Sequence, residues 1–582
     1  MHRLQGIAVS PGICICEALV IENDKGVRIP QRFITADGVQ DEIDFCQEAF
    51  HKVADEIAQN RDTITKQLGK QYGAIFSAHL QMVGDPELKK KVEHFIRDKR
   101  YSAAYAVSRA MRQFAKVFEG LDDAYLAERV QDIFDIESRL LNKLLGTKFE
   151  YLSSLNQEAV VFAHNLTPSE TANLDRGHVR GFVTEVGGLG GHTSIIAEAL
   201  QIPAVVAAGH FLEKVQSGDT VIVDGNSGQV YLCPDEETLA QYETLLEEEK
   251  SRASELELLS DLPAETLDGT NIELRANIEF PEELTCCLEN GAQGVGLYRT
   301  EFLYLTRSTE PDEEAHYQAY AQVAEAFGNQ PVTIRTLDMG ADKINTSFED
   351  LEESNPFLGV RSIRLSLRDL PPFRTQIRAI LRASVKGNLQ VMFPLISTLR
   401  EFRQAKMIVA DIMEDLEEEG IPFNRDIPIG IMVEVPSAVI MLDRFVKEVD
   451  FISIGTNDLI QYTMAVDRTN KEVADLYQPS NPAVLRLIES SIVHANAGGI
   501  LSTLCGQMSG SPAYTMLLLG LGLRSFSVAP ASIPEIKKTC RQVTIKQCQT
   551  IAKKVMTLEG TGEINSYLRE QYRKVTEVAE ET

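Results

Sequence analysis

Apolar residues follow two different spacings along the chain, and the changes between them divide it into regions. Around residues 6–21 (GIAVSPGICICEALVI), and again after Glu158, short runs rich in Val and Ile are bounded by Gly, Pro, Asn or Asp, which is typical of β-strands. From about Phe33 to Gly146 apolar residues recur at three- and four-residue steps, the spacing of one buried helix face, as in Leu126, Val130, Ile133, Leu140, Leu141, Leu144 and Leu145. This region is predicted to form about four helices packed as a bundle.

The N-terminal strands need partners, and a later segment can supply them. Residues 147–234 contain five further strand-like runs, EAVVFAHNL, VRGFVTEV, PAVVAA, TVIVDG and QVYLCP. Two helices are expected between them, one after Thr167 and one after His192. We therefore expect residues 1–32 and 147–234 to form one discontinuous α/β domain, into which the helical bundle of residues 33–146 is inserted.

The remaining chain predicts a linking helix and a barrel. Residues 235–260 have a strongly charged helical pattern, which indicates a helix that either bridges two bodies or packs on one of them. In residues 261–582 strands and helices alternate; the candidate strands are IELRANIE, GVGLYRTEFL, VTIRTLDM, LQVMFPLI, IPIGIMVEV, FISIGTND, GILSTLCG and SFSVAP. Eight βα units in roughly 300 residues is the plan of a TIM (β/α)8 barrel.

Composition narrows the function classes. The 582 residues are too many for one core, and their net charge of -28 argues against nucleic acid as the main partner, because acidic surfaces repel phosphate backbones. The acidity either aids solubility or suits a basic protein partner. The sequence contains no stretch of about 18 uncharged apolar residues, so we expect no membrane insertion. The polar start MHRLQGIAVSPG does not resemble a signal peptide, and the nine cysteines form no C-x-x-C pair, so we expect reduced thiols and a cytoplasmic location.

Charged and polar side chains gather where the predicted barrel strands end. They are Arg299, Glu301, Arg335, Asp338, Glu434, Asn457, Asp458 and Cys505. Active sites of such barrels lie at the C-terminal ends of the strands, so this clustering predicts an active site. Glu434 and Asp458 suit a hard cation such as Mg²⁺, unless they are merely salt-bridged. Arg299, Arg335 and Arg468 supply forked donors that match phosphate and carboxylate oxygens, which together indicate a pocket for a small polyanion.

Two further residues carry candidate chemistry. Cys505 is either a buried thiol that packs as a small hydrophobic group, or an acid that delivers a proton to a reacting carbon. His192 lies in GGLGGHTSIIAEAL, where glycines precede an expected helix start. The free N–H groups of a helix start favour an anion, and a neutral imidazole can attack phosphorus. The alternative is that His192 caps the helix or packs in a core.

Several motifs resemble one family. GLYRTEFL, NPFLGVRSIRL, FPLIST, GIMVEVPSA, FISIGTNDLIQYTMAVDR and YQPSNPAVLRLI are similar to enzyme I of the phosphoenolpyruvate-dependent sugar phosphotransferase system, the phosphoenolpyruvate-protein phosphotransferases. The resemblance covers nearly the whole chain. It implies a swivelling phosphohistidine domain with an inserted helical bundle, a linker helix and a C-terminal barrel. It also implies that phosphoenolpyruvate phosphorylates the protein, which then phosphorylates the carrier protein HPr.

The resemblance assigns roles residue by residue. His192 would accept the phosphoryl group and Cys505 would be the proton donor. Phosphoenolpyruvate would be bound by a further set, namely Arg299, Arg335, Asn457, Asp458 and Arg468, with Arg361 and Lys343 as additional phosphate contacts. Mg²⁺ would be held by Glu434 and Asp458. Thr171 would either orient the His192 ring or cap a helix.

The resemblance also implies partners. The helical insert would dock HPr, and the barrel would carry the interface of a homodimer. Asp85 and Glu87, with His79 one turn upstream, are candidates for steering a basic face of HPr, although they equally suit a solvated helix face. His192 and the barrel lie in separate predicted domains, so we expect a swivel with the linker helix as its hinge.

Three departures from the family pattern leave alternatives open. Gly190 and Gly191 replace Thr-Ser before the active histidine, Ala341 replaces Gly, and Gln507 and Ser509 replace Glu and Ala. These departures leave open the alternative that the chain is a phosphoenolpyruvate-sensing protein or a nitrogen-pathway relative with reduced turnover. Nitrogen-pathway relatives usually carry an additional N-terminal domain, which favours the sugar pathway. A pyruvate phosphate dikinase or phosphoenolpyruvate synthase would need a nucleotide-binding domain, for which we find no glycine-rich segment before residue 150.

Overall fold

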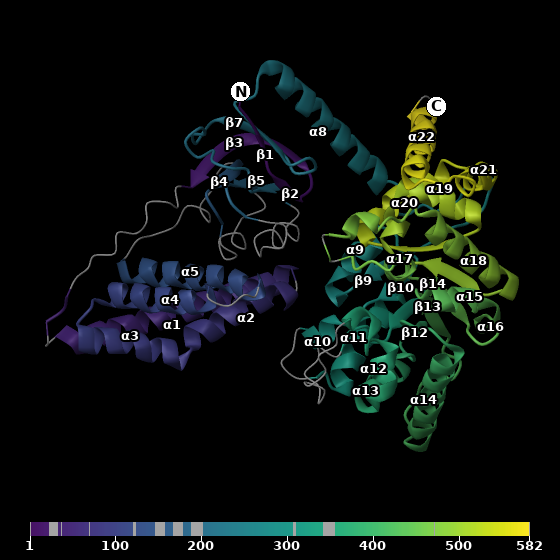
Figure 1. Ribbon diagram of the computed structural model, residues 1–582, viewed down its shortest axis with the longest axis horizontal. Coiled ribbons are helices and arrows are strands. Elements are labelled where there is room, and N and C mark those ends of the chain that lie inside the picture. Colours follow the sequence, from purple (N-terminus) through teal and green to yellow (C-terminus); the bar gives the residue numbers. More distant parts are fainter. Residues whose placement is uncertain are drawn as a thin grey trace. The chain divides into compact units, whose positions relative to one another are not determined.

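The computed structural model describes residues 2–21, 33–35, 38–68, 70–119, 124–145, 158–166, 178–187, 202–305, 310–340, 355–468, 470 and 472–580 (Figure 1). The chain forms two compact units, Met1–Ser251 and Arg252–Thr582. The boundary between them lies inside helix α8 (Glu236–Glu257), within the segment expected to be a charged helix. None of the helices in these ranges carries an apolar stretch long enough to cross a membrane.

An eight-stranded sheet joins the N-terminal strands to the later ones. Its strands are β1 (His2–Gln5), β2 (Ile7–Ser10), β3 (Ile13–Ile21), β4 (Ala159–Ala163), β5 (Val179–Thr184), β6 (Ala204–Val206), β7 (Thr220–Asp224) and β8 (Gln229–Leu232), in the order β1-β8-β7-β3-β4-β5-β6-β2. Strand β3 pairs in parallel with β4 and antiparallel with β7. The expectation that residues 147–234 supply partners to the first strands is therefore confirmed. All five residues of β4 are buried, as a central parallel strand requires.

The inserted helices number five in the described part of the chain, against about four expected. They are α1 (Val39–Leu68), α2 (Lys70–Gly84), α3 (Pro86–Lys99), α4 (Ala103–Glu119) and α5 (Ala124–Leu145). Asp85 separates α2 from α3, because its side chain accepts hydrogen bonds from the backbone N–H groups of Glu87 and Leu88. Pro86 follows at the first helical position, where its missing N–H costs nothing.

The second unit is a closed barrel of eight parallel strands (Figure 1). The strands are β9 (Glu273–Ile278), β10 (Val295–Tyr298), β11 (Val332–Arg335), β12 (Leu389–Phe393), β13 (Ile429–Val433), β14 (Phe451–Ile454), β15 (Leu501–Leu504) and β16 (Ser525–Val528), and β16 closes the ring by pairing with β9. All eight strands predicted from the sequence are confirmed. They are short and almost wholly buried, as a parallel sheet covered on both faces must be.

The barrel helices lie between successive strands, except the last three, which follow β16. They are α9 (Leu284–Glu289), α10 (Phe302–Leu305), α11 (Glu313–Phe327), α12 (Ile363–Arg368), α13 (Leu370–Ala383), α14 (Leu399–Glu418), α15 (Pro436–Ile440), α16 (Leu442–Phe445), α17 (Thr456–Met464), α18 (Pro482–Gly498), α19 (Pro512–Leu521), α20 (Ile533–Arg541), α21 (Ile545–Val555) and α22 (Thr561–Glu580). Side chains from neighbouring barrel strands form a separate buried apolar cluster. Its members are Leu297, Met392, Met432, Phe451 and Cys505. This filling leaves polar chemistry to the carboxyl ends of the strands.

Candidate functional site

The described site residues predicted from the sequence lie on one rim of the barrel. Arg299 follows β10, Arg335 ends β11, Glu434 follows β13, Asp458 stands in the first turn of α17 after β14, and Cys505 follows β15. Because all eight strands are parallel, their carboxyl ends share one face, and side chains that are far apart in the sequence meet there.

Arg335 is held between two carboxylates. Its Nη2 lies 3.1 Å from Glu301 Oε1 and its Nη1 lies 2.9 Å from Asp338 Oδ2. Burial opposes the charge on this guanidinium, but Glu301, Asp338 and more distant acids more than offset that effect and keep the pKa of Arg335 above its usual value. The guanidinium is therefore a fixed positive charge with a defined orientation.

Asp338 also contacts a second arginine. Its Oδ1 lies 3.3 Å from Nη2 of Arg361 and accepts a hydrogen bond from the Ser362 hydroxyl. Burial raises the pKa of this carboxyl, but Arg335 and Arg361 lower it further than burial raises it. Glu301 and Asp338 were visible in the sequence only as charges at strand ends. Their role in holding the arginines could not be inferred, because it depends on the positions of the loops.

Glu434 and Asp458 form a pair of buried carboxyl groups. Glu434 is 1% exposed and its Oε1 accepts a hydrogen bond of 2.5 Å from the Leu395 N–H. Burial raises the pKa of Glu434, and Asp458 and Asp338 raise it further. The pKa of Asp458 is also raised, by burial and then by Asp338, against the opposing effect of Arg468. Two carboxyl groups that resist ionisation together would be stabilised by a cation between them.

The pair fits Mg²⁺ as a partial ligand set. Asp458 Oδ1 is buried and has no hydrogen-bond partner among the described residues, so it is available as a ligand. The described residues contain no cluster of three or more His, Cys, Asp or Glu side chains arranged to hold a metal. Mg²⁺ usually takes one or two carboxylates and completes its shell with water and substrate phosphate, so two carboxyl groups can be sufficient as its protein ligands.

Cys505 lies at the bottom of a cleft in the same rim. The cleft has a volume of about 430 Å³, and its lining includes Asn277, Glu279, Arg299, Cys505, Gln507 and Ser511. Burial raises the pKa of Cys505 to about 11, against a lowering contribution from the Ser453 hydroxyl, so the group is a protonated thiol at neutral pH. Arg299 forms an ion pair with Glu279 beside it.

Asn277 supports the cleft from β9 and was not indicated by the sequence. Its Nδ2 donates to the backbone oxygens of Cys505, at 3.2 Å, and Ser527, at 3.1 Å. Its Oδ1 accepts from the Ser527 hydroxyl at 2.6 Å. An asparagine at the end of a strand is too common for sequence reasoning to single it out; only the closure of β16 against β9 shows what it holds.

The remaining two candidates on the rim face the neighbouring loops. Asn457 Oδ1 accepts a hydrogen bond of 3.1 Å from the backbone N–H of Gln507. The backbone N–H of Arg468 donates to Gln461 Oε1 at 3.2 Å, and its guanidinium is near enough to Asp458 to lower the pKa of that carboxyl. The structure thus brings Arg335, Arg361, Arg468, Glu434 and Asp458 into one electrostatic group.

Three candidates lie outside the described residues. They are His192, Lys343 and Thr171, and with them the departures at Gly190, Gly191 and Ala341. The described chain after β5 extends to Gly187, five positions before His192. At this edge of the sheet His164 Nδ1 lies 2.8 Å from Glu185 Oε2, and Glu185 Oε1 accepts hydrogen bonds from the N–H groups of Phe211 and Leu212.

One expectation for the helical insert is wrong. His79 was grouped with Asp85 and Glu87 as part of an exposed acidic face, but its side chain is fully buried. Its Nε2 lies 3.1 Å from Asp132 Oδ1 and its Nδ1 lies 3.5 Å from Asp135 Oδ2. A histidine at this position belongs to the interior because it lies on the apolar side of α2, one turn before the helix ends.

Comparisons with known proteins agree with this arrangement. Models of the PEP-utilising enzymes match residues 5–129 (N-terminal), 155–228 (mobile domain) and 253–545 (PEP-binding domain). Proteins named phosphoenolpyruvate-protein phosphotransferase are similar over nearly the whole length. Those of Geobacillus stearothermophilus and Staphylococcus carnosus are 42% and 41% identical, covering 98% of this chain and 98% and 99% of theirs. That of Bacillus subtilis is 40% identical, covering 98% of this chain and all of its own.

Proposed function

Since the chain belongs to the family of phosphoenolpyruvate-protein phosphotransferases, we propose that it transfers the phosphoryl group of phosphoenolpyruvate to its own His192. The group then passes to a histidine of the carrier protein HPr, the first step of the sugar phosphotransferase system. The observation that carries the proposal is the convergence of Arg335, Arg361, Glu434 and Asp458 on one rim of the barrel, with Cys505 at the base of the adjoining cleft.

The arginines are suited to bind phosphoenolpyruvate. The substrate carries a phosphate and a carboxylate, and guanidinium groups bind both through paired N–H donors. Arg299, Arg335, Arg361 and Arg468 would supply these donors, with Asn457 as a neutral contact and Lys343 as a further cation. Arg335 is oriented by Glu301 and Asp338 without substrate, so binding loses little side-chain entropy.

Glu434 and Asp458 would hold Mg²⁺. When bound, the ion offsets negative charge on the phosphoryl oxygens. The unpartnered Oδ1 of Asp458 supports this assignment, and so does the raised pKa of both carboxyl groups, which burial and the charge of Asp338 cause in each, with Asp458 raising the pKa of Glu434 further.

The chemistry then needs a nucleophile and an acid. A neutral ring nitrogen of His192 forms the new bond to phosphorus while the bond from phosphorus to the enol oxygen breaks, and its electrons pass to the enolate. Cys505 gives its proton to the methylene carbon of that enolate, which leaves as pyruvate. Because the pKa of the Cys505 thiol is raised to about 11, the thiol keeps this proton at neutral pH. It releases the proton only to a strong base such as an enolate.

The division of the chain supports a moving phosphoryl carrier. We assign the phosphohistidine domain to residues 1–32 and 147–234, HPr docking to residues 33–146, the hinge to residues 235–260, and the homodimer interface to residues 261–582. His192 must come within about 3–3.5 Å of phosphorus in the barrel and later meet HPr, which requires a swivel. The proposed location is the cytoplasm, where phosphoenolpyruvate and HPr would be available.

The decisive experiment follows the phosphoryl group. The protein is incubated with labelled phosphoenolpyruvate, Mg²⁺ and HPr, as wild type and as His192→Ala. His210→Ala is the matched control, because His210 is an exposed histidine of the same unit. Acid-labile, base-stable label in the wild type and control, absent from His192→Ala, would support the proposal.

Two outcomes would contradict it. Equal labelling of His192→Ala would remove the assignment of the acceptor. Tight binding of phosphoenolpyruvate without phosphohistidine or labelled HPr would instead indicate the phosphoenolpyruvate-sensing alternative. The swivel has its own test, a cross-link that holds the two units apart, after which undiminished self-phosphorylation would exclude domain motion.

A further inference from the structure

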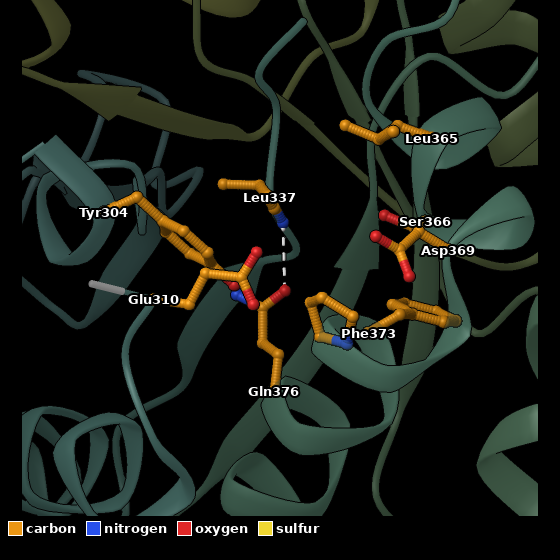
Figure 2. A pocket seen from close by; sticks show the side chains of 9 residues that line it. Tyr304, Glu310, Leu337, Leu365, Ser366, Asp369, Phe373 and Gln376 are labelled. Atoms are coloured by element: carbon orange, nitrogen blue, oxygen red, sulfur yellow. Dashed lines mark hydrogen bonds between the residues drawn. The ribbon is translucent and has the colours of Figure 1, made fainter. Parts of the chain in front are cut away.

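One buried amide connects the outside of the barrel to its arginine site. Gln376 on α13 is 1% exposed, and its Oε1 accepts a hydrogen bond of 3.0 Å from the backbone N–H of Leu337. Figure 2 shows the Gln376 side chain directed at this N–H. The Nε2 of the same side chain donates to Thr300 Oγ1 at 3.0 Å and to the Tyr320 hydroxyl at 3.1 Å.

These bonds define the orientation of the amide. A backbone N–H can only donate, so the atom that faces Leu337 must be the oxygen, and Nε2 must face the two hydroxyls. The Thr300 hydroxyl, which accepts from Gln376, donates in turn to the backbone oxygen of Arg335 at 3.0 Å. Gln376 therefore holds the chain at two points, the backbone oxygen of Arg335 through Thr300 and the backbone N–H of Leu337 directly.

The held segment carries the groups that orient Arg335. Asp338, which follows Leu337, contacts Arg335 with its carboxylate, and its backbone N–H donates to Glu301 Oε1 at 2.9 Å. Glu301 follows Thr300 directly and forms the other ion pair of Arg335. A shift of this turn would move both carboxylates that fix the guanidinium.

Packing alone does not hold the turn. A cavity of about 20 Å³, room for about one water molecule, is lined by Leu337 and Gln376 together with Tyr304 and Phe373 (Figure 2). With empty space beside it, Leu337 can move when its hydrogen bond is lost. The position of the turn then depends on the amide rather than on contact between apolar side chains.

We propose that Gln376 is a positioning residue for phosphoenolpyruvate binding, acting through the Leu337 N–H and Thr300 on the guanidinium of Arg335. This inference rests on the function proposed above. Gln376 touches no substrate. From its position on α13 it fixes the backbone at Arg335 and Leu337, and thereby the position of the Arg335 side chain.

Gln376→Met tests the proposal, because methionine has similar length and flexibility but makes none of the three hydrogen bonds. We expect the dissociation constant for phosphoenolpyruvate, measured by calorimetry on the full chain with Mg²⁺, to rise at least about tenfold. The matched control is Thr333→Val, which removes a 3.1 Å hydrogen bond to Gln390 from the same strand β11 without touching the turn. It should lower the melting temperature and leave binding within about twofold.

A second variant keeps the test decisive if Gln376→Met folds poorly. Thr300→Val removes a single hydroxyl and breaks only the link to the Arg335 backbone. We expect it to raise the dissociation constant as well. The double variant should bind no more weakly than Gln376→Met, since Thr300 is one of the two links through which Gln376 acts.

The inference fails if either variant has a lower melting temperature while binding phosphoenolpyruvate as tightly as wild type, because Gln376 would then only satisfy buried polar groups. A wild-type protein that neither binds nor uses phosphoenolpyruvate would overturn the proposed function itself. The two failures are distinguishable, because the first is judged against a wild type that binds.

Discussion

Asp338 Oδ2 lies 2.9 Å from Nη1 of Arg335, and the other oxygen of the same carboxylate lies 3.3 Å from Nη2 of Arg361. One buried carboxylate thus sets the spacing of two guanidinium groups, one at the end of β11 and one just before α12. A spacing fixed before substrate arrives is what a site for a small polyanion requires, since each arginine would otherwise have to be ordered on binding.

Asp338→Asn should therefore lower kcat/KM for phosphoenolpyruvate by about 10- to 100-fold, because a charge-assisted contact to each arginine is lost. The pH dependence follows from the lowered pKa of Asp338: burial opposes ionisation, but Arg335 and Arg361 more than offset it. The ion pairs of Asp338 with the two arginines are therefore complete at any pH above the usual aspartate pKa. They are lost only when the pH falls through the lowered pKa of Asp338. The exposed Asp443→Asn is the control, and equal kinetics of the two variants would contradict the assignment.

The carboxyl pair should bind a divalent cation more weakly when either member is neutralised. Glu434→Gln and Asp458→Asn are expected to weaken Mn²⁺ binding, followed by electron paramagnetic resonance, at least about tenfold. Burial and the neighbouring Asp338 raise the pKa of both carboxyl groups, so the pair takes up protons at a higher pH than free carboxyl groups do. Wild-type affinity for the cation should therefore drop with decreasing pH. Glu448→Gln, which removes a half-buried acid paired with Arg403, should leave binding unchanged.

Cys505→Ala should slow pyruvate formation by about 10²- to 10⁴-fold while leaving phosphoenolpyruvate affinity near that of wild type, because the thiol donates a proton and does not hold the substrate. Its pKa of about 11 also predicts slow alkylation by iodoacetamide at pH 8. Cys540→Ala, another buried thiol of the same unit, is the control and should form pyruvate normally. A Cys505→Ala protein with wild-type turnover would require another proton donor.

Alkaline pH should destabilise the barrel unit. Burial raises the pKa of Cys540 and of Cys548 to about 12, from a usual value of 9.0. A raised folded-state pKa gives stability that is complete below the unfolded value and is lost as pH rises towards the folded value. Between these limits each thiol lowers the unfolding free energy by about 1.4 kcal/mol per pH unit. Urea unfolding from pH 8 to 11 should show this slope, and a Cys540→Ala/Cys548→Ala double variant should show a smaller one.

Gly506 permits a close approach between two strand ends. A Cβ built there would stand 1.7 Å from Thr456 Oγ1 and 3.0 Å from the Thr456 backbone nitrogen. Gly506→Ala should therefore separate Cys505 from the first turn of α17, which carries Asn457, and cost at least about tenfold in kcat/KM. Gly560→Ala, where the nearest atom is 3.8 Å away, is the control. Unchanged kinetics for Gly506→Ala would show that the rim relaxes without affecting the site.

The sequence predicted much of the fold because the patterns concerned are local or repeated. Eight Val/Ile-rich runs spaced by helices were enough to predict the barrel, and strands without partners at the N-terminus were enough to predict the joined sheet. The break between α2 and α3 also has a local sequence signal, the N-cap Asp85 followed by Pro86. About four helices were nevertheless expected where the described residues form five. His79 was misplaced because a polar residue type was taken as a sign of exposure.

By itself the sequence determined which residues stand at the rim of the barrel as candidates for the chemistry, since Arg335, Glu434, Asp458 and Cys505 each lie at or just after the end of a recognisable strand. Only the tertiary structure decided how these groups are held: Asp338 between two arginines, Asn277 beneath Cys505, and Gln376 behind Arg335. The physical reason is that, apart from the Asp338–Arg335 ion pair, these contacts join residues tens to hundreds of positions apart. Their energies depend on distance and burial, which no local spacing encodes.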